Sequence, residues 1–227
     1  MIDLSEAAKW DRGEPHQLAA WNWLQEQLTD QQLAEFAVMF RAGPVPPASR
    51  PTNPLSPVPY FSQLDNGPQG WRQCQTSSIA MALAYLKTPG IVDDMDYLRV
   101  VQQFGDTTVQ ASHAQALKRL NVRARFRQDM SPDMIMGEIR AGYPVAAGIL
   151  HHGPATAPRG GGHYVLVHGF TANSWIVHDP YGELDLVAGG WVRQGGLHGM
   201  GLAYSFQNFN RRWAPEGPGS GWGWVFS

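Results

Sequence analysis

The chain has a single cysteine among its 227 residues. One cysteine excludes a disulfide within the chain and a zinc site built mainly of thiolates. Long apolar runs are also missing: no stretch approaches the roughly 20 apolar residues of a membrane-spanning helix, so we expect no membrane span. The first ten residues show neither the basic nor the apolar part of a signal peptide. We therefore expect cytoplasmic synthesis without a signal peptide, which leaves the place of action open.

Charge is scarce as well. Charged residues make up 16% of the chain and the formal net charge is -2. A surface with so few cations offers no basic stripe for a phosphate backbone, so nucleic acid is not an expected partner. The composition does not indicate an oligomeric state. What is present is a 43% apolar share, enough for one sizeable core.

The chain divides into three parts by pattern. Residues 1–43 carry apolar residues at helical spacing and a capping box at Thr29, which predicts a helical hairpin for targeting or docking. Residues 44–59 are rich in proline and predict an extended linker. Residues 60–227 contain the main domain.

Within the main domain, the predicted helices come first and the predicted strands follow. This order favours an α+β fold with helices packed on an antiparallel sheet. We expect helices at residues 75–87, 94–104 and 110–120 and another capped by Ser131, and strands at 60–62, 145–150, 163–168, 174–178 and 201–206.

Cys74 lies between a loop of glycine, proline and tryptophan and an alanine-rich helical segment. At a helix N-terminus, unpaired N–H groups and the helix dipole favour the thiolate form of cysteine. A cysteine placed only for packing is expected inside the apolar stripe, with Ile79 and Leu83. The position therefore predicts a nucleophile.

His163 and Asp179 are expected to lie at the same end of a β-hairpin. His163 follows three glycines and opens one strand, and Asp179 ends the returning strand. If Gly169 pairs with Ser174, His163 lies opposite Pro180 and beside Asp179. Opposed side chains in an antiparallel pair are close enough to interact, which makes His163 a candidate base and Asp179 its orienting partner.

The other histidines are candidate metal ligands, but their spacing does not form a metal-binding motif. His168 and His178 belong to the same hairpin, and His151 and His152 are adjacent in a loop. No HExxH or comparable spacing is present. We expect structural roles for most of them, and a place beside a substrate groove for His151 or His152, with no metal and no cofactor.

Four segments carry a pattern that is more specific in combination than any one alone. They are Val58–Gln63, Trp71–Met81, Gly162–Gly169 and His178–Gly182. Over residues 57–210 they resemble papain-like cysteine peptidases related to the bacteriocin-processing, double-glycine leader peptidases. One residue departs from the pattern: many members have glycine after the cysteine, where this chain has Gln75.

The resemblance implies a papain-like fold and a catalytic role for each of four residues. It assigns Cys74 as nucleophile, His163 as general base and then acid, and Asp179 as the orienting residue. It implies that a glutamine ahead of the cysteine stabilises the oxyanion, and Gln63 matches by its place in the Val58–Gln63 motif. Gln69 and Gln73 lie nearer to Cys74 and remain alternatives.

We therefore expect a cysteine peptidase or amidase that hydrolyses peptide bonds. The aromatic ends of the chain are similar to those of phage lytic proteins, which suggests an endolysin-type enzyme acting on peptidoglycan stem peptides, at the cell wall or in a phage particle. Two alternatives stay open. One is a non-catalytic binding or phage structural module on the same scaffold, and the other is acyl transfer through the same residues.

Overall fold

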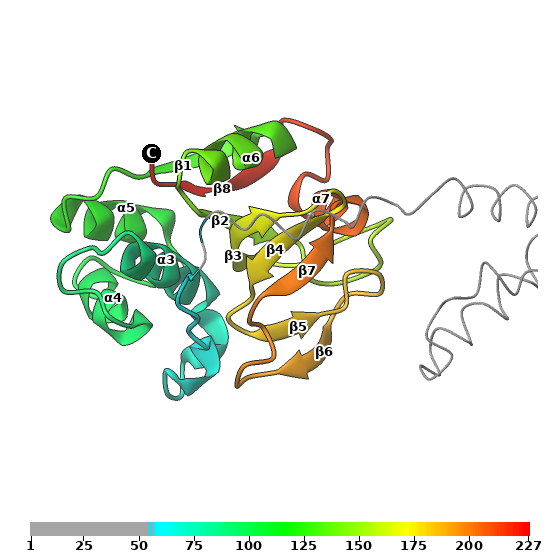
Figure 1. Cartoon of the computed structure of the whole chain (residues 1–227). Helices are drawn as coiled ribbons and strands as arrows, with labels where there is room; N and C mark the ends of the chain where they lie inside the picture. The colour runs from blue at the N-terminus through cyan, green and yellow to red at the C-terminus, as the bar shows by residue number, and fades with distance from the viewer. Residues whose placement is uncertain (1–54, 56) are drawn as a thin grey trace, which may run out of the picture. The chain divides into compact units, whose positions relative to one another are not determined.

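A six-stranded antiparallel sheet is the centre of the computed structural model, which describes residues 55 and 57–227. The strand order is β1-β8-β2-β3-β4-β7, and β5 and β6 form a separate two-stranded sheet (Figure 1). The hairpin expected at 1–43 and most of the linker expected at 44–59 lie outside the described residues. The strands are β1 (Arg125–Met130), β2 (Val145–Ile149), β3 (His163–Phe170), β4 (Ser174–His178), β5 (Gly182–Leu184), β6 (Trp191–Gln194), β7 (Leu202–Ser205) and β8 (Gly221–Val225).

Three helices cover one face of the sheet: α3 (Cys74–Tyr85), α4 (Asp94–Val101) and α5 (Gln110–Arg119). Two short 3-10 turns, η1 (Gln63–Asp65) and η2 (Gly70–Arg72), precede α3. Because neighbouring residues of a strand point to opposite faces, Ala146 and Leu166 face this layer. They share an apolar cluster with Ile79 of α3, Tyr97 of α4 and Leu117 of α5.

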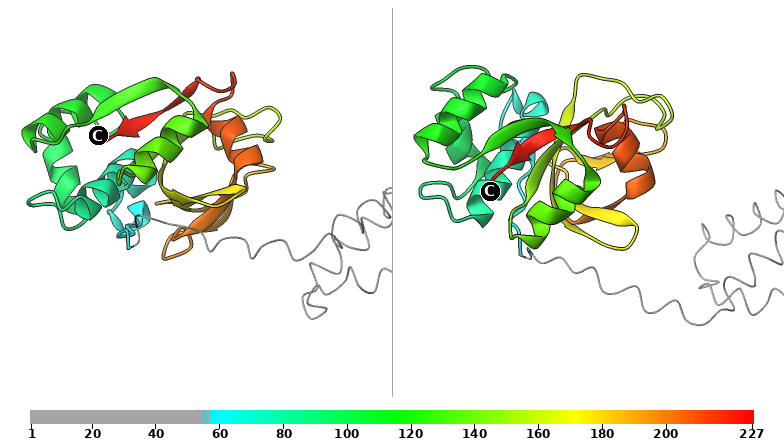
Figure 2. Two further views of the ribbon diagram at one scale, coloured as in Figure 1. Left: turned by 45° about the horizontal axis from the view of Figure 1, so that its top comes forward. Right: turned by 90° about the horizontal axis from the view of Figure 1, so that it is seen from above.

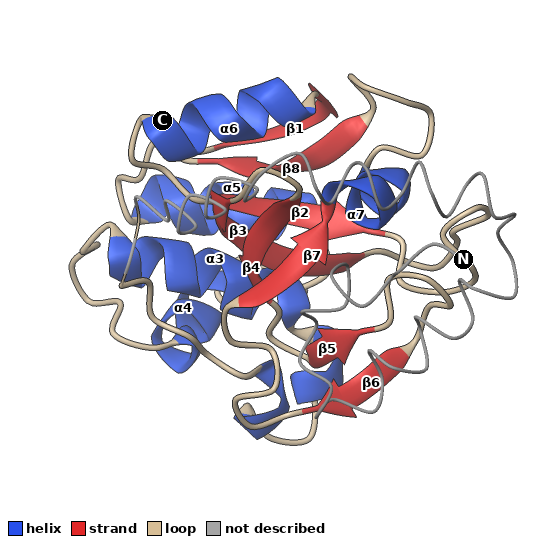
Figure 3. Ribbon diagram, turned by 45° about the vertical axis from the view of Figure 1, so that its right-hand side comes forward, coloured by secondary structure: helices blue, strands red, loops and turns tan. Residues whose placement is uncertain are grey.

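Two further helices, α6 (Pro132–Arg140) and α7 (Phe206–Trp213), pack on the opposite face. Ile139 of α6 and Phe209 of α7 join Val145, Ala147 and Val167 in a second apolar cluster. Figures 2 and 3 show α3, α4 and α5 grouped on one side of the sheet and α6 and α7 apart from them. This arrangement is the expected α+β fold.

The helix starts follow local chemistry. Ser131 accepts a hydrogen bond from the Met134 backbone and Pro132 occupies the first turn, so the predicted cap of α6 is confirmed. At α4, Asp93 and Asp96 form a reciprocal capping box that the sequence analysis did not identify. None of the described helices is long and apolar enough to cross a membrane.

Several predicted elements are wrong or incomplete. Residues 60–62 are not a strand: Ser62 is extended, but it caps η1, and the next residue, Gln63, donates its backbone N–H to Pro180. The strand expected at 201–206 ends at Ser205, where α7 begins. The sequence analysis did not predict β1, β5, β6, β8 or α7.

The tryptophan-rich C-terminus is part of the core. Trp213 and Trp224 are 0% and 2% exposed, and Trp224 lies in β8 between β1 and β2. Trp213 donates its indole N–H to the Trp222 carbonyl. These two tryptophans are therefore not available to bind a cell wall or a virion partner.

Candidate active site

Cys74 is the first residue of α3, as the sequence analysis expected. Its side chain is half-buried, whereas residues 75–83 behind it are buried. The residue before it, Gln73, makes no side-chain capping bond, so the first N–H groups of the helix are not occupied by a cap. The thiol thus sits at the positive end of the α3 dipole, partly open to solvent.

His163 is the first residue of β3 and contacts both Cys74 and Asp179. Its Nε2 donates to Asp179 Oδ1 at 2.7 Å, because a carboxylate can only accept. That bond leaves Nδ1 for the Cys74 side chain, which also hydrogen-bonds the ring. His163 is 3% exposed and Asp179 is 0% exposed. A sulfur, an imidazole and a carboxylate therefore lie in series.

The charge balance of this series favours a protonated imidazole. Burial lowers the pKa of His163, but the Asp179 carboxylate and the hydrogen bonds with Asp179 and Cys74 outweigh it and raise the pKa to about 10. The imidazolium can therefore stabilise a Cys74 thiolate through its Nδ1–H, while Asp179 accepts the hydrogen bond from its Nε2–H.

Asp179 is a buried carboxylate with several hydrogen-bond donors. Oδ1 also accepts from the Tyr181 backbone N–H at 3.0 Å, and Oδ2 accepts from the Tyr204 hydroxyl at 3.1 Å. Its backbone N–H donates to Gly199, and its carbonyl accepts from Tyr60. A Cβ on Gly199 would lie 1.8 Å from the Asp179 carbonyl, so only glycine fits there. These contacts offset the desolvation of the carboxylate and fix its position.

The hairpin brings His163 and Asp179 together by a register that differs from the expected one. Gly169 pairs with Ile176, not with Ser174, and Leu166 pairs with His178. The register shifts between Val167 and Gly169, at a bulge that the sequence does not announce. The two side chains meet because Asp179 lies just beyond the end of β4 and turns toward the start of β3.

An aromatic wall surrounds the His163 ring. The Trp191 ring meets it edge-on at 4.8 Å, and Tyr181 stacks on Trp191 at 4.4 Å. The His151 ring lies 5.9 Å from His163. The sequence analysis placed His151 or His152 beside a groove but missed Trp191 and Tyr181. No sequence signal identifies Trp191, which reaches the site through β6, a strand of the separate sheet.

Gln63 is buried beside the segment that carries Asp179. Its backbone N–H donates to Pro180, and its side-chain amide donates to Gly70 at 2.7 Å. Gln73 is buried next to Cys74 with an Oε1 atom that lacks a partner, and Gln69 is exposed. The oxyanion-hole role of Gln63 stays a prediction, as do the catalytic roles of the other three residues.

Gln75, which replaces the family's glycine, joins α3 to three other elements. Its amide donates to Gln110 Oε1 at 2.6 Å. Gln110 in turn donates to the Tyr164 hydroxyl at 2.8 Å and accepts from Trp224 at 3.0 Å. The substitution therefore adds a hydrogen-bond network behind the cysteine.

The remaining histidines form contacts of other kinds. His168 and His178 are buried with ring centroids 4.0 Å apart, and His178 bonds the Val58 carbonyl and the Gly201 N–H. In the part of the chain that the structure describes, no group of three His, Cys, Asp or Glu residues is arranged to hold a metal ion.

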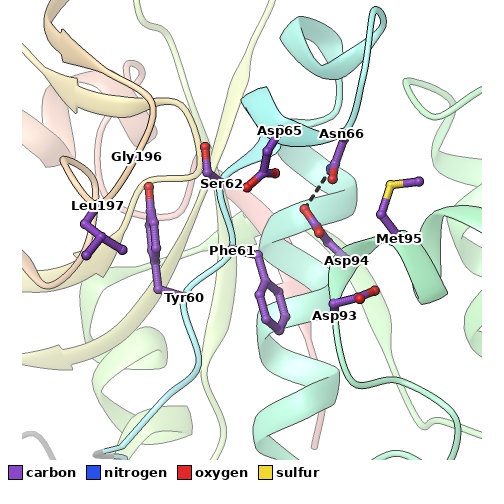
Figure 4. Close-up of a pocket in the computed structure, with 10 residues that line it drawn as sticks. All are labelled: Tyr60, Phe61, Ser62, Asp65, Asn66, Asp93, Asp94, Met95, Gly196 and Leu197. Atoms are coloured by element: carbon purple, nitrogen blue, oxygen red, sulfur yellow. Dashed lines mark hydrogen bonds between the residues drawn. The ribbon is translucent and has the colours of Figure 1, made fainter.

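A cavity of about 390 Å³ lies close to the backbone that supports Asp179, but neither Cys74 nor His163 lines it. Figure 4 shows Tyr60 on one side and Asp94, bonded to Asn66, on the other. Burial raises the pKa of Asp94, which two buried polar side chains, Asn66 and Ser77, bond. This hollow is separate from the Cys74 and His163 contact.

Comparisons with known proteins find a matching family model and a similar solved structure. The Peptidase C39 like family model matches residues 55–215. A protein of Bacillus anthracis described as a C39-like peptidase has a similar crystal structure, with a TM-score of 0.51 and 17% identity over 76% of this chain and 96% of that chain. No curated protein matches the chain. The family match covers most of the sequence, and the similar structure supports the papain-like α+β fold. The chain therefore belongs to the Peptidase C39 like family.

Proposed function

We propose that the chain is a cysteine peptidase that hydrolyses peptide bonds with Cys74 as nucleophile, His163 as base and Asp179 as orienting residue. The observation that carries the proposal is the buried series in which His163 bonds Asp179 at 2.7 Å and also bonds the Cys74 side chain. Membership of a peptidase-like family supports the reaction class.

The geometry fits acyl transfer to sulfur. The Cys74 thiolate attacks the scissile carbonyl, and the developing oxyanion lies near the N–H groups at the start of α3, with the Gln63 amide as the second donor. The His163 imidazolium then gives its Nδ1 proton to the leaving amine, so the C–N bond breaks and a thioester remains. The neutral imidazole deprotonates a water molecule, which cleaves the thioester and restores the thiol.

For the substrate we propose a peptide of the bacterial cell wall, as in an endolysin. One feature near the nucleophile supports it: Trp71, three residues before Cys74, is 62% exposed, and the Arg72 guanidinium lies 5.9 Å from its ring. An exposed flat aromatic face is suited to packing on a sugar ring, and the Arg72 guanidinium beside it is itself paired with Asp106 at 2.9 Å.

A zymogram on purified peptidoglycan tests both parts. We expect the wild type to clear the gel and Cys74→Ala to leave it opaque, with circular dichroism showing that both proteins are folded. Equal clearing by both would remove Cys74 from the mechanism.

A second assay separates the reaction from the substrate. An internally quenched peptide library is incubated with the same two proteins. Cleavage that depends on Cys74, without any clearing of the wall, would keep the peptidase and reject the wall substrate.

A further inference from the structure

His151 has an unusual position beside the proposed base. Its ring centroid lies 5.9 Å from that of His163 and 6.0 Å from that of Trp191. No described residue hydrogen-bonds to either of its ring nitrogens, and Nδ1 is fully enclosed without a partner. A buried polar atom without a partner is costly, so native structures rarely keep one without a use.

The backbone under His151 is held on both sides. Its carbonyl accepts from Gly190, at 2.9 Å. Arg212, on α7, is 0% exposed and donates to the carbonyls of Leu150, at 2.9 Å, and Gly153, at 2.7 Å. The ring is thus presented by a fixed loop, so its unused hydrogen-bonding capacity is not a consequence of a mobile segment.

The surroundings determine the protonation of the ring. Burial, together with the positive charges of His163, His152 and Arg212, lowers the pKa of His151 to about 4. The ring is therefore neutral at pH 7. The enclosed Nδ1 has no acceptor nearby, so an N–H at that position would cost more than an unprotonated nitrogen. The proton of the neutral ring therefore lies on Nε2, the nitrogen that is not enclosed.

The position of His163 indicates which part of a substrate this N–H meets. In the proposed reaction the acyl part stays on the Cys74 sulfur, and the leaving amine is the part that His163 protonates. We therefore take a side chain that packs on the His163 ring, as His151 does at 5.9 Å, to border the leaving part of the peptide.

We propose that His151 binds the leaving part of the peptide substrate by donating a hydrogen bond from Nε2 to one of its carbonyl oxygens. This inference rests on the proposed function. The site then favours substrates that continue beyond the scissile bond, because a small amine leaving group has no carbonyl to accept the hydrogen bond from His151.

Two substrates with one acyl sequence test the inference. One is a peptide that the wild type cleaves, selected from an internally quenched library, and the other is the same acyl sequence as a 2-naphthylamide, whose leaving amine has no carbonyl. We expect His151→Ala to lower kcat/KM for the peptide about tenfold and to change kcat/KM for the naphthylamide less than twofold.

His151→Gln is the informative second variant, because its side-chain amide nitrogen can take the place of Nε2. We expect it to recover most of the peptide activity, whereas His151→Asn, whose amide reaches only the position of Nδ1, does not. His198→Ala, which removes an exposed histidine ring outside the aromatic cluster of His151, His163 and Trp191, is the matched control and is expected to act like the wild type on both substrates.

The outcomes separate this inference from the proposed function. An equal loss on both substrates would overturn it, because His151 would then act on His163 and not on the leaving part. No loss on either would overturn it as well. A wild type that cleaves no peptide of the library would reject the proposed function, and the inference with it.

Discussion

At the scale of the residue, the proposed chemistry depends on one imidazole between a sulfur and a carboxylate. Both partners of His163 are needed for opposite reasons: Cys74 uses its proton, and Asp179 fixes the ring that carries the proton. Asp179 and His163 can each be replaced, and the two variants are expected to lose different properties of the site.

Asp179→Asn should leave the cysteine in place but lose the negative charge that raises the pKa of His163. We expect kcat/KM to fall on the order of 100- to 10,000-fold, as when an orienting carboxylate is replaced in other triads. Peptide hydrolysis measures the loss. Tyr204→Phe is the control, since it removes only the 3.1 Å bond to Oδ2 and the bond from the Leu184 N–H, and a loss as large as that of Asp179→Asn would contradict the orienting role.

His163→Ala should slow the alkylation of Cys74 by iodoacetamide at pH 6. A free thiol with a pKa near 8.5 is only about 0.3% thiolate at that pH. The wild type keeps a protonated imidazole beside the sulfur, because the pKa of His163 is raised to about 10, so its thiolate is stabilised. We expect the variant to react at least tenfold more slowly, measured by intact mass. Equal rates in the two proteins would favour the non-catalytic module.

Residue-level reasoning from the sequence reached Cys74, His163 and Asp179 because each stands at an element boundary with a local signal: a helix start, a glycine run, and an Asp-Pro end. The same reasoning could not identify Trp191, which is marked by its position in the folded structure and not by any pattern in the sequence. Nor could it choose among the glutamines ahead of Cys74, since backbone turns between them decide which amide faces the sulfur.

At the scale of the element, periodicity predicted the helices and the strands in the middle of the chain. It failed at β1 and β8, because β1 is mostly polar and Gly221–Val225 alternates tryptophan with glycine, a residue that is depleted in strands. It also missed the bulge in β3, since an inserted residue changes the pairing without changing the composition of the strand. Strand order was beyond local patterns, because the last strand inserts between β1 and β2.

Gln110 joins four of these elements by hydrogen bonds. Replacing it should show how much these bonds stabilise the fold. Gln110→Ala leaves the Gln75 amide, the Tyr164 hydroxyl and the Trp224 indole without their partner. We expect the free energy of unfolding in urea to fall by about 1–3 kcal/mol. Gln115→Ala, on the exposed side of the same helix, is the control and should be near neutral. An equal effect of both variants would show that the network adds no stability.

At the scale of the whole molecule, several buried histidines are kept neutral. Burial lowers the pKa of His113 to about 4 and that of His168 to about 3, and it also lowers the pKa of His178. His163 has the opposite sign, because its partners raise its pKa. His151 is lowered as well, so among the described histidines with a shifted pKa protonation opposes folding at four and favours it at one.

The sign of the pH dependence follows from these shifts. A histidine with a folded pKa below 6.5 binds fewer protons in the folded than in the unfolded state, so stability is fully present above pH 6.5 and is lost as the pH falls toward the folded pKa. His163 contributes stability below pH 6.5 that is lost as the pH rises through about 10. Between pH 6.5 and 4 the four lowered histidines outnumber the raised one, and we expect net destabilisation in acid.

His113 offers the clearest test, because its ring is 0% exposed and bonds Tyr97 and the Thr107 carbonyl. Its own share of the acid destabilisation between pH 7 and pH 4 is about 3 kcal/mol. His113→Gln lowers the stability at pH 7, but it should flatten the fall of unfolding free energy between pH 7 and pH 4, measured by urea titration at each pH. His198→Gln, at an exposed histidine, is the control. A slope that is the same in the wild type and in His113→Gln would mean that protonation of this buried ring does not drive acid unfolding.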